Sequence, residues 1–150
     1  MFKYFRLISY LSTLCFLSSC EPVYRADIVN TTSKALLLEL KFDQTTLETH
    51  WNGMPYIEFL KSYPNGLGIH TIRFDSSELK NYYMIPPGAT FPLESGVGTE
   101  PTFELFKCLR IIGKDTIELK GRSAIEEAFL KTDKRRWELH IVSDNPEYSL

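Results

Sequence analysis

The sequence is poor in the residues that build metal and nucleophilic sites. Among its 150 residues there are three cysteines and three histidines, His50, His70 and His140. A zinc site needs three or four ligands at a workable spacing, and the chain has no His-x-x-x-His or Cys-x-x-Cys pair. A Gly-x-Ser-x-Gly elbow and a Walker-type phosphate loop are also missing. The sequence therefore predicts no metal, no cofactor and no catalytic residue, and the protein is not expected to be an enzyme.

Long apolar runs and an excess of basic residues are missing as well. The run from Leu7 to Leu17 is interrupted only by Ser and Thr. At about eleven residues it is shorter than the roughly 20 needed to span a bilayer. The 17 Lys and Arg are balanced by 19 Asp and Glu. This balance argues against a general nucleic-acid-binding protein, because such proteins depend on a basic surface.

The first twenty residues contain the most specific motif. Lys3 and Arg6 precede the apolar run, and the run ends at Leu17-Ser18-Ser19-Cys20. This pattern resembles the signal peptide and lipobox of bacterial lipoproteins, in which two small residues precede the cysteine to be modified. The resemblance covers residues 1–20 alone. It implies that residues 1–19 are removed as a signal peptide and that Cys20 carries the lipid anchor. An ordinary secretory cleavage region and a short uncleaved membrane helix remain as alternatives.

Residues 20–150 have the length of one globular domain. Removal of the signal peptide takes two basic residues and no acidic one, so the formal charge falls from −2 to −4. Cys108 then remains as the one unmodified cysteine, which excludes an intramolecular disulfide and predicts a small core residue. Glu21 follows Cys20, where some inner-membrane lipoproteins have aspartate. We therefore expect a cell-envelope protein at the outer membrane, with its periplasmic or surface face left open.

The first half of this domain alternates between strand patterns and turn residues. Val23–Val29 and Ala35–Phe42 are strand-like, and the Asn-Thr-rich residues between them predict a β-hairpin. Residues 43–83 are irregular and predict a long, partly helical connection, with a strand in His70–Phe74. Tyr82–Ile85 is the next predicted strand, and it stops at Pro86-Pro87-Gly88, which predicts an edge or a corner.

The second half has clearer periodicity. Phe91 and Leu93 mark a short strand before the segment 95–98, which is predicted to be flexible. Phe103–Ile112 is apolar on both faces and predicts a central strand, followed by a hairpin into Thr116–Lys120. Ser123 and Glu126 have the spacing of a capping box and predict a two-turn helix that ends near residue 131. A last strand is predicted from the alternation of Trp137, Leu139 and Ile141.

These seven or eight strands predict a mainly β domain. Turn signals recur roughly every 8–12 residues without a βαβ rhythm, which favours an antiparallel β-sandwich with one short helix. The pattern of strand, Asn-Thr turn, apolar strand and Pro-Gly corner resembles immunoglobulin-like modules of exported bacterial proteins. A partly open β-barrel is the alternative.

Five aromatic residues among the turns are the candidate binding residues. They are Trp51, Tyr56, Tyr63, Tyr82 and Tyr83. Exposed aromatic side chains stack on sugars or form the centres of protein interfaces. The structural alternative is that these rings close one end of the sandwich. His50, beside Trp51, is the histidine with the most site-like context.

A second candidate surface is basic. Lys131, Lys134, Arg135 and Arg136 surround one predicted turn. Such a cluster suits anionic head groups or lipopolysaccharide phosphates. A solvated hairpin tip is the alternative explanation.

These observations lead to three functional hypotheses. The first is a lipid-anchored, non-catalytic envelope protein that binds another protein or assists an assembly, and it predicts an apolar patch around Trp51 and Tyr56. The second is a carbohydrate-binding or glycan-binding module with coplanar exposed aromatics. The third is a hydrolase, which needs a cleft that joins His50 or a carboxylate to a partner residue.

Overall fold

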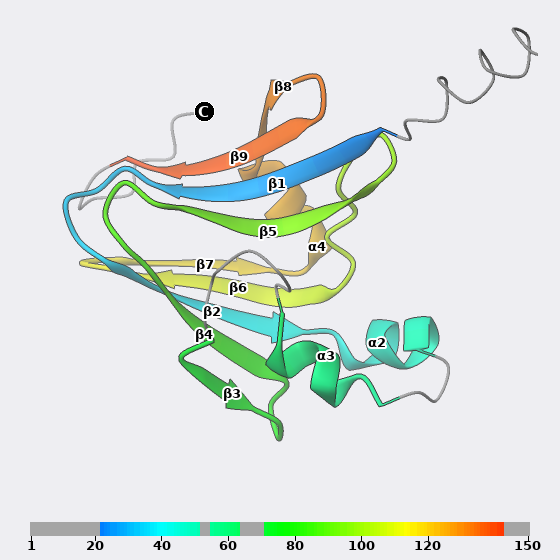
Figure 1. The fold of residues 1–150 in the computed structure, drawn as a ribbon. Helices are drawn as coiled ribbons and strands as arrows, with labels where there is room; N and C mark the ends of the chain where they lie inside the picture. The colour runs from blue at the N-terminus through cyan, green and yellow to red at the C-terminus, as the bar shows by residue number, and fades with distance from the viewer. Residues whose placement is uncertain (1–21, 52–54, 64–70, 143–150) are drawn as a thin grey trace, which may run out of the picture.

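The computed structural model describes residues 22–51, 55–63 and 71–142. The signal peptide, Cys20 and His70 lie outside these residues. Two β-sheets are stacked face to face, and three short helices lie at their ends and connections (Figure 1). The predicted mainly β sandwich is confirmed, and the described strands do not close into a barrel.

Sheet A contains four strands in the order β5-β1-β9-β8. β1 is antiparallel to β5 and parallel to β9, so the expectation of a wholly antiparallel sandwich is wrong for one strand pair. Two strands that are joined by a tight turn must be antiparallel. No such turn joins β1 to β9, so these two strands can pair in parallel. The strands are β1 (Val23–Asn30), β5 (Thr90–Val97), β8 (Leu130–Asp133) and β9 (Arg136–Ile141).

Sheet B contains five antiparallel strands in the order β3-β4-β2-β6-β7. β6 lies between β2 and β7, which confirms the central position expected from its apolar faces, although it begins three residues later than predicted. The strands are β2 (Leu36–Phe42), β3 (Arg73–Asp75), β4 (Lys80–Ile85), β6 (Phe106–Ile112) and β7 (Thr116–Lys120).

The predicted hairpin between β1 and β2 is wrong, because the two strands belong to different sheets. Asn30 directs the chain from one sheet to the other. Its buried side-chain amide donates hydrogen bonds to the carbonyl oxygens of Lys34, Ile85 and Pro86 at 2.8, 2.9 and 3.0 Å. It thereby joins this crossing to the corner at Pro86-Pro87-Gly88, where the chain returns from β4 to β5, as the sequence predicted.

The segment predicted to be flexible is part of a strand. Ser95, Gly96 and Val97 lie in β5 and face Arg25, Tyr24 and Val23 of β1. Local composition suggested a loop, whereas pairing with a strand seventy residues away fixes the backbone. This is a tertiary effect that β-propensity does not include.

Within the described residues there are three short helices instead of the single one expected. Those in the irregular third confirm a partly helical connection there. The predicted capping box is wrong, because the last helix follows Gly121 without a side-chain cap and Glu126 binds Arg122 at 2.6 Å instead. This helix ends three residues earlier than expected, and β8 follows it. The helices are α2 (Gln44–Trp51), α3 (Ile57–Lys61) and α4 (Arg122–Ala128).

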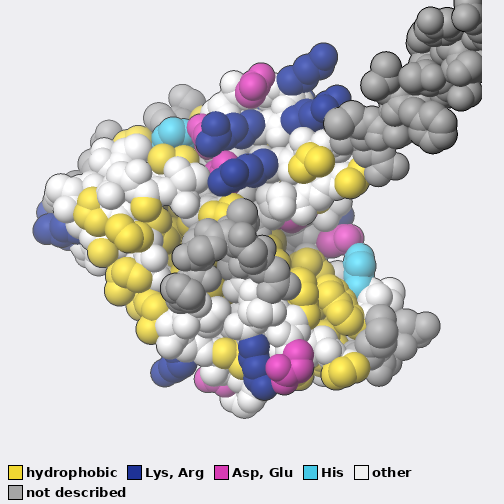
Figure 2. All heavy atoms as spheres, in the orientation of Figure 1, with side chains coloured by type: hydrophobic (Ala, Val, Ile, Leu, Met, Phe, Trp, Pro, Cys, Tyr) yellow, Lys and Arg dark blue, Asp and Glu magenta, His cyan; other side chains and the backbone are white. Residues whose placement is uncertain are grey.

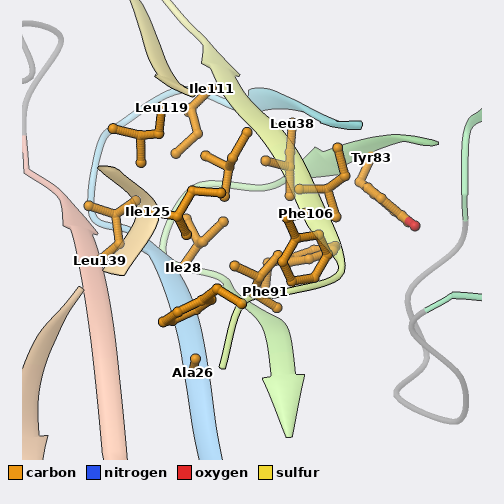
Figure 3. Packing of buried hydrophobic residues seen from close by; sticks show 14 of the residues in the cluster. Ala26, Ile28, Leu38, Tyr83, Phe91, Phe106, Ile111, Leu119, Ile125 and Leu139 are labelled. Carbon is orange, nitrogen blue, oxygen red and sulfur yellow. The ribbon is translucent and has the colours of Figure 1, made fainter. Parts of the chain in front are cut away.

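The core lies between the sheets. Figure 3 shows Ile28 and Phe91 of sheet A turned toward Leu38 and Ile111 of sheet B, with Ile125 of α4 among them. All five side chains have at most 1% of their surface exposed. Each is expected to contribute about 1.5–3 kcal/mol of transfer free energy, so the sandwich is held chiefly by contacts between its sheets.

Candidate binding cleft

Two of the five candidate aromatics belong to the core. Tyr83 is fully buried and Tyr63 is 8% exposed. The Tyr63 hydroxyl donates to the Leu93 carbonyl, and the Tyr83 hydroxyl donates to the Tyr63 carbonyl. Burial raises the pKa of Tyr63 well above its usual value and that of Tyr83 to about 12, so both phenols keep their protons. These rings hold α3 and β5 against sheet B.

The other three candidates are partly buried. Tyr82 precedes Tyr83 on β4 and therefore points to the opposite, outer face of sheet B, where the Arg73 guanidinium lies 4.5 Å from its ring centroid. Tyr56 precedes α3, and Trp51 ends α2. The five residues thus do not form one surface. Trp51 and Tyr63 border the same cavity together with polar groups, and Trp51 is the less buried of the two.

A cleft of about 300 Å³ separates α2 from the end of β5. Figure 2 shows the molecule hollowed on the side of α2, with hydrophobic side chains in the hollow. We call it the Trp51 cleft. Its volume is at the lower limit of the roughly 300–1,000 Å³ typical of small-molecule sites. It is lined by Tyr24, His50, Trp51, Phe59, Tyr63, Pro92, Leu93, Glu94, Ser95, Thr102, Glu104 and Leu105.

Aromatic rings form its apolar wall. The centroids of Trp51 and Phe59 are 4.6 Å apart with their planes 39° apart, and Phe59 meets Tyr63 edge-on at 5.4 Å. Asp43 fixes the helix that presents Trp51, because its carboxylate accepts the Thr46 backbone N–H at 2.9 Å at the start of α2. The apolar wall is therefore attached to a capped helix.

Glu94 organises the opposite wall. One carboxylate oxygen accepts the Tyr24 hydroxyl at 2.7 Å and the Thr102 backbone N–H at 2.9 Å. The other accepts the Phe103 backbone N–H at 2.9 Å. This hydrogen bonding and burial together raise the pKa of Tyr24, with burial the larger cause. Because both oxygens are occupied, Glu94 holds the wall in place and is a poor candidate for an acid or base.

The loop that Glu94 holds has a strained backbone. Phe103 has φ +49°, a left-handed conformation that costs a non-glycine residue about 1–2 kcal/mol. Its ring is 1% exposed and packs on Phe129 at a centroid distance of 4.9 Å. Ring burial and the bond to Glu94 offset the strain. They place Thr102, Glu104 and Leu105 along the cleft.

A glycine makes room for Tyr24 in this wall. Gly96 faces Tyr24 across the β1–β5 pair, and a Cβ atom at this position would lie 2.8 Å from the Tyr24 hydroxyl oxygen. The ring therefore lies over the glycine and reaches Glu94. Any larger residue at position 96 displaces the Tyr24 ring and weakens its bond to Glu94.

An exposed polar pair borders the cleft. His50 Nε2 lies 3.2 Å from Glu104 Oε1, with 47% and 40% of the two side chains exposed. His50 Nδ1 lies 3.2 Å from the Thr46 carbonyl within α2. The pair joins α2 to the 102–105 loop, and its exposure makes it weak. His50 therefore does lie at the cleft, as its context beside Trp51 suggested.

Other reactive side chains lie elsewhere. Ser77 and Lys80 have the Ser-x-x-Lys spacing of some acyl-transferring enzymes, but Lys80 Nζ pairs with Glu78 at 2.7 Å and Glu39 at 3.3 Å. These contacts raise the pKa of Lys80, which makes it a poor candidate for a general base. Cys108 is half-buried and borders the outer face of sheet B rather than the core; burial raises the pKa of its thiol.

Residues 22–51, 55–63 and 71–142 contain no group of three His, Cys, Asp or Glu side chains placed to hold a metal ion. The described lining of the Trp51 cleft combines aromatic rings, hydroxyl groups and one exposed ion pair, without a thiol or a lysine. This arrangement suits the binding of an apolar group with polar edges.

A second depression lies at the opposite end of the sandwich, where β1, β4 and β6 end. Its volume is about 410 Å³. We call it the Met84 groove. Its described lining has no aromatic side chain and consists mainly of strand ends and hairpin tips. Its lining is Thr32, Lys34, Ala35, Leu36, Leu37, Met84, Ile111, Ile112, Gly113, Lys114, Asp115, Ile117 and Ile141.

No protein-family model, curated protein or solved structure matches the chain. Among the described residues, none of the helices combines the length and apolarity needed to cross a membrane. The likeness to immunoglobulin-like modules stays a prediction from sequence pattern.

The sequence pointed to Trp51 and His50 on one wall of the cleft and did not point to Glu94 on the other wall. Trp51 and His50 stood out because aromatic and imidazole side chains are conspicuous among turn residues. Glu94 and the 102–105 loop gave no such signal, since a single carboxylate after a short strand is ordinary. The pairing of Tyr24 with Gly96 was the missing information, because it brings the start of the domain beside residues seventy positions later.

Proposed function

We propose that this protein is exported, anchored by lipid on Cys20, and binds an apolar segment of another envelope protein in the Trp51 cleft without catalysis. The observation that carries the proposal is that both walls of the cleft, one aromatic and one polar, are held in place. A capped helix presents Trp51, and Glu94 fixes the facing loop through three hydrogen bonds. Such preorganised concave surfaces bind with little ordering cost.

A protein segment fits this cleft better than a glycan does. Sugar stacking needs an exposed, flat aromatic face, whereas the Trp51 ring is partly buried and inclined at 39° to Phe59. Aromatic residues in partly enclosed pockets are typical centres of protein interfaces. Of the patch expected around Trp51 and Tyr56, Trp51 lines the cleft with Phe59 and Leu105 beside it, whereas Tyr56 is not part of the lining.

The anchor is tested by Cys20→Ala in cells supplied with labelled fatty acid. The native protein should incorporate label and remain with the membrane fraction, and the variant should do neither. Label retained by Cys20→Ala would contradict anchoring at this residue. Outer-membrane placement is tested separately by fractionating the two membranes.

The cleft is tested by photo-crosslinking in intact cells. A photoreactive residue replaces exposed Ser95 at the cleft, and a matched one replaces exposed Asp115 at the Met84 groove. We expect one discrete product from position 95, and its yield should fall when Trp51→Ala is added. Equal products from both positions, or a product insensitive to Trp51→Ala, would contradict binding in the cleft.

A further inference from the structure

Basic side chains gather where β1 and β9 begin. β1 and β9 run parallel with Arg25 beside Arg136, and the Arg25 backbone N–H donates to the Arg135 carbonyl at 3.0 Å. The β8–β9 turn is thereby held against the start of β1 (Figure 1). Figure 2 shows Lys and Arg side chains close together on this part of the surface. We call the group the basic edge: Arg25, Lys131, Lys134, Arg135 and Arg136.

Nearby acidic groups neutralise part of this charge. Asp27 lies 2.6 Å from Arg25 and 3.4 Å from Arg136, although its second oxygen makes no hydrogen bond. Glu138 lies 2.8 Å from Arg136. Including Asp133, whose carboxylate accepts the Lys134 backbone N–H at 2.6 Å, three acids face five bases. The basic edge therefore has a net positive charge, whereas the domain as a whole is acidic.

The bases of the turn itself are the ones available to a partner. Lys134 and Arg135 are exposed and form no ion pair with any residue in the described ranges. Lys131 differs, because its ammonium lies 4.8 Å from the Trp137 ring centroid. Lys134 and Arg135 therefore offer two unneutralised charges at the tip of the hairpin.

Exposed apolar side chains lie beside the basic turn. Val23 and Val97 face each other across the β1–β5 pair and are 60% and 62% exposed. Leu130 on β8 is 52% exposed. Apolar side chains next to Lys and Arg are the combination that binds the boundary between lipid head groups and acyl chains.

Chain length sets the distance between this edge and the proposed anchor. Two residues separate Cys20 from Val23, so the chain takes three Cα-to-Cα steps between them. An extended chain spans at most about 3.6 Å per residue, so Val23 lies within roughly 11 Å of the lipidated residue. That distance is close to the Debye length of about 8 Å at physiological ionic strength. Any such anchor therefore brings the start of β1 into the electrostatic reach of the head groups.

We propose that the basic edge and the Val23–Val97 pair dock the domain onto an anionic lipid surface, the one in which Cys20 is anchored. The inference rests on the proposed lipid anchor for its geometry. Each base near an anionic surface strengthens binding roughly fivefold, and the tether supplies a high effective concentration. Docking then fixes which side of the sandwich faces the membrane.

The test uses the two tryptophans of the chain, Trp51 and Trp137. In a Trp51→Phe background, Trp137 beneath Lys131 is the sole tryptophan donor, and excitation at the red edge of its absorption band avoids the tyrosines. The full-length protein is reconstituted into vesicles that carry a dansyl-labelled lipid, made of phosphatidylglycerol or of phosphatidylcholine. We expect stronger energy transfer on phosphatidylglycerol, and we expect the difference to disappear in high salt.

The decisive variant is Lys134→Gln/Arg135→Gln, which removes the two unneutralised bases. It should lower the ratio of docked to undocked domains roughly 25-fold on phosphatidylglycerol. Lys114→Gln/Lys120→Gln, on the β6–β7 hairpin, removes the same charge elsewhere and should leave the ratio unchanged. Energy transfer that is independent of lipid charge, or equal losses in both double variants, would overturn the docking proposal.

Vesicle flotation of the same samples separates this proposal from the proposed anchor. Protein that floats with both lipids but shows no charge-dependent transfer retains the anchor and refutes docking. Protein that lacks acyl chains but binds phosphatidylglycerol through Lys134 and Arg135 refutes the anchor and supports docking. Protein that floats with neither lipid refutes both.

Discussion

The two ends of this sandwich differ in how their depressions are built. The Met84 groove is the larger, at about 410 Å³, yet it consists of aliphatic strand ends and hairpin tips. The Trp51 cleft is smaller, at about 300 Å³, and combines aromatic rings with a loop held by a carboxylate. At the groove end, the polar contacts are buried. The Asn30 side chain hydrogen-bonds to the backbone at two corners of the chain.

In this sandwich, the volume of a depression is a poor guide to its function. At the groove end, the buried Asn30 amide hydrogen-bonds to backbone carbonyl groups, so it does not point toward a ligand. At the cleft end, Glu94 stabilises Phe103 in a left-handed conformation. Strained backbone persists only where surrounding contacts enforce it, and it is common at binding sites. The smaller depression is therefore the better candidate.

The largest expected effect is on stability at the groove end. Asn30→Ala removes three hydrogen bonds to carbonyls at the two corners and two that Thr32 donates to the Asn30 side chain. Buried polar groups left without partners cost about 1 kcal/mol or more each, so we expect a loss of about 3 kcal/mol. Urea unfolding measures it. A loss below about 1 kcal/mol would show that the corners do not depend on Asn30.

The second effect is a loss of stability at the cleft end, caused by a substitution of Glu94. Glu94→Gln retains one acceptor oxygen and introduces an amide donor that faces backbone N–H groups. We expect a loss of about 2 kcal/mol in unfolding free energy and a weaker crosslink from position 95. Glu104→Gln is the matched control, since its exposed pair with His50 contributes at most about 0.5 kcal/mol. Equal losses in the two variants would contradict a special role for Glu94.

The third effect separates two of the aromatic candidates. Trp51→Ala should lower the position-95 crosslink at least about tenfold, because truncation of an interface tryptophan commonly costs 2 kcal/mol or more. Tyr82→Ala removes a partly buried ring from the outer face of sheet B, where it contacts Arg73. It should leave the crosslink unchanged. Should Tyr82→Ala have the larger effect, the partner would bind sheet B instead of the cleft.

Much of the fold followed from local patterns. Alternation in Leu36–Phe42 and Thr116–Lys120 predicted strands where β2 and β7 lie, and Pro86-Pro87-Gly88 predicted the corner after β4. These features depend on side-chain period and on the missing N–H of proline, both of which are local. The partners of each strand did not follow from such patterns, and β1 was paired with the wrong neighbour.

The errors share a physical cause, which is competition from residues distant in sequence or unexpected in orientation. Asn30 was interpreted as a turn residue, whereas its amide binds carbonyls fifty-five residues away. Ser123 does not cap the last helix, because α4 already begins at Arg122 and Ser123 lies inside it. For the cleft, Trp51 was identified from composition, but Glu94 acquires its meaning only through Tyr24 and Phe103.

The smallest expected effect is the one that most directly tests the choice of depression. Met84→Thr alters an exposed side chain, 49% accessible, in the middle of the Met84 groove. Threonine suits a strand, so we expect a change in unfolding free energy within about 0.5 kcal/mol and an unaltered crosslink from position 95. A variant that folds normally but loses the crosslink would transfer the binding role to the larger groove. Glu94 and the strained loop would then contribute to stability alone.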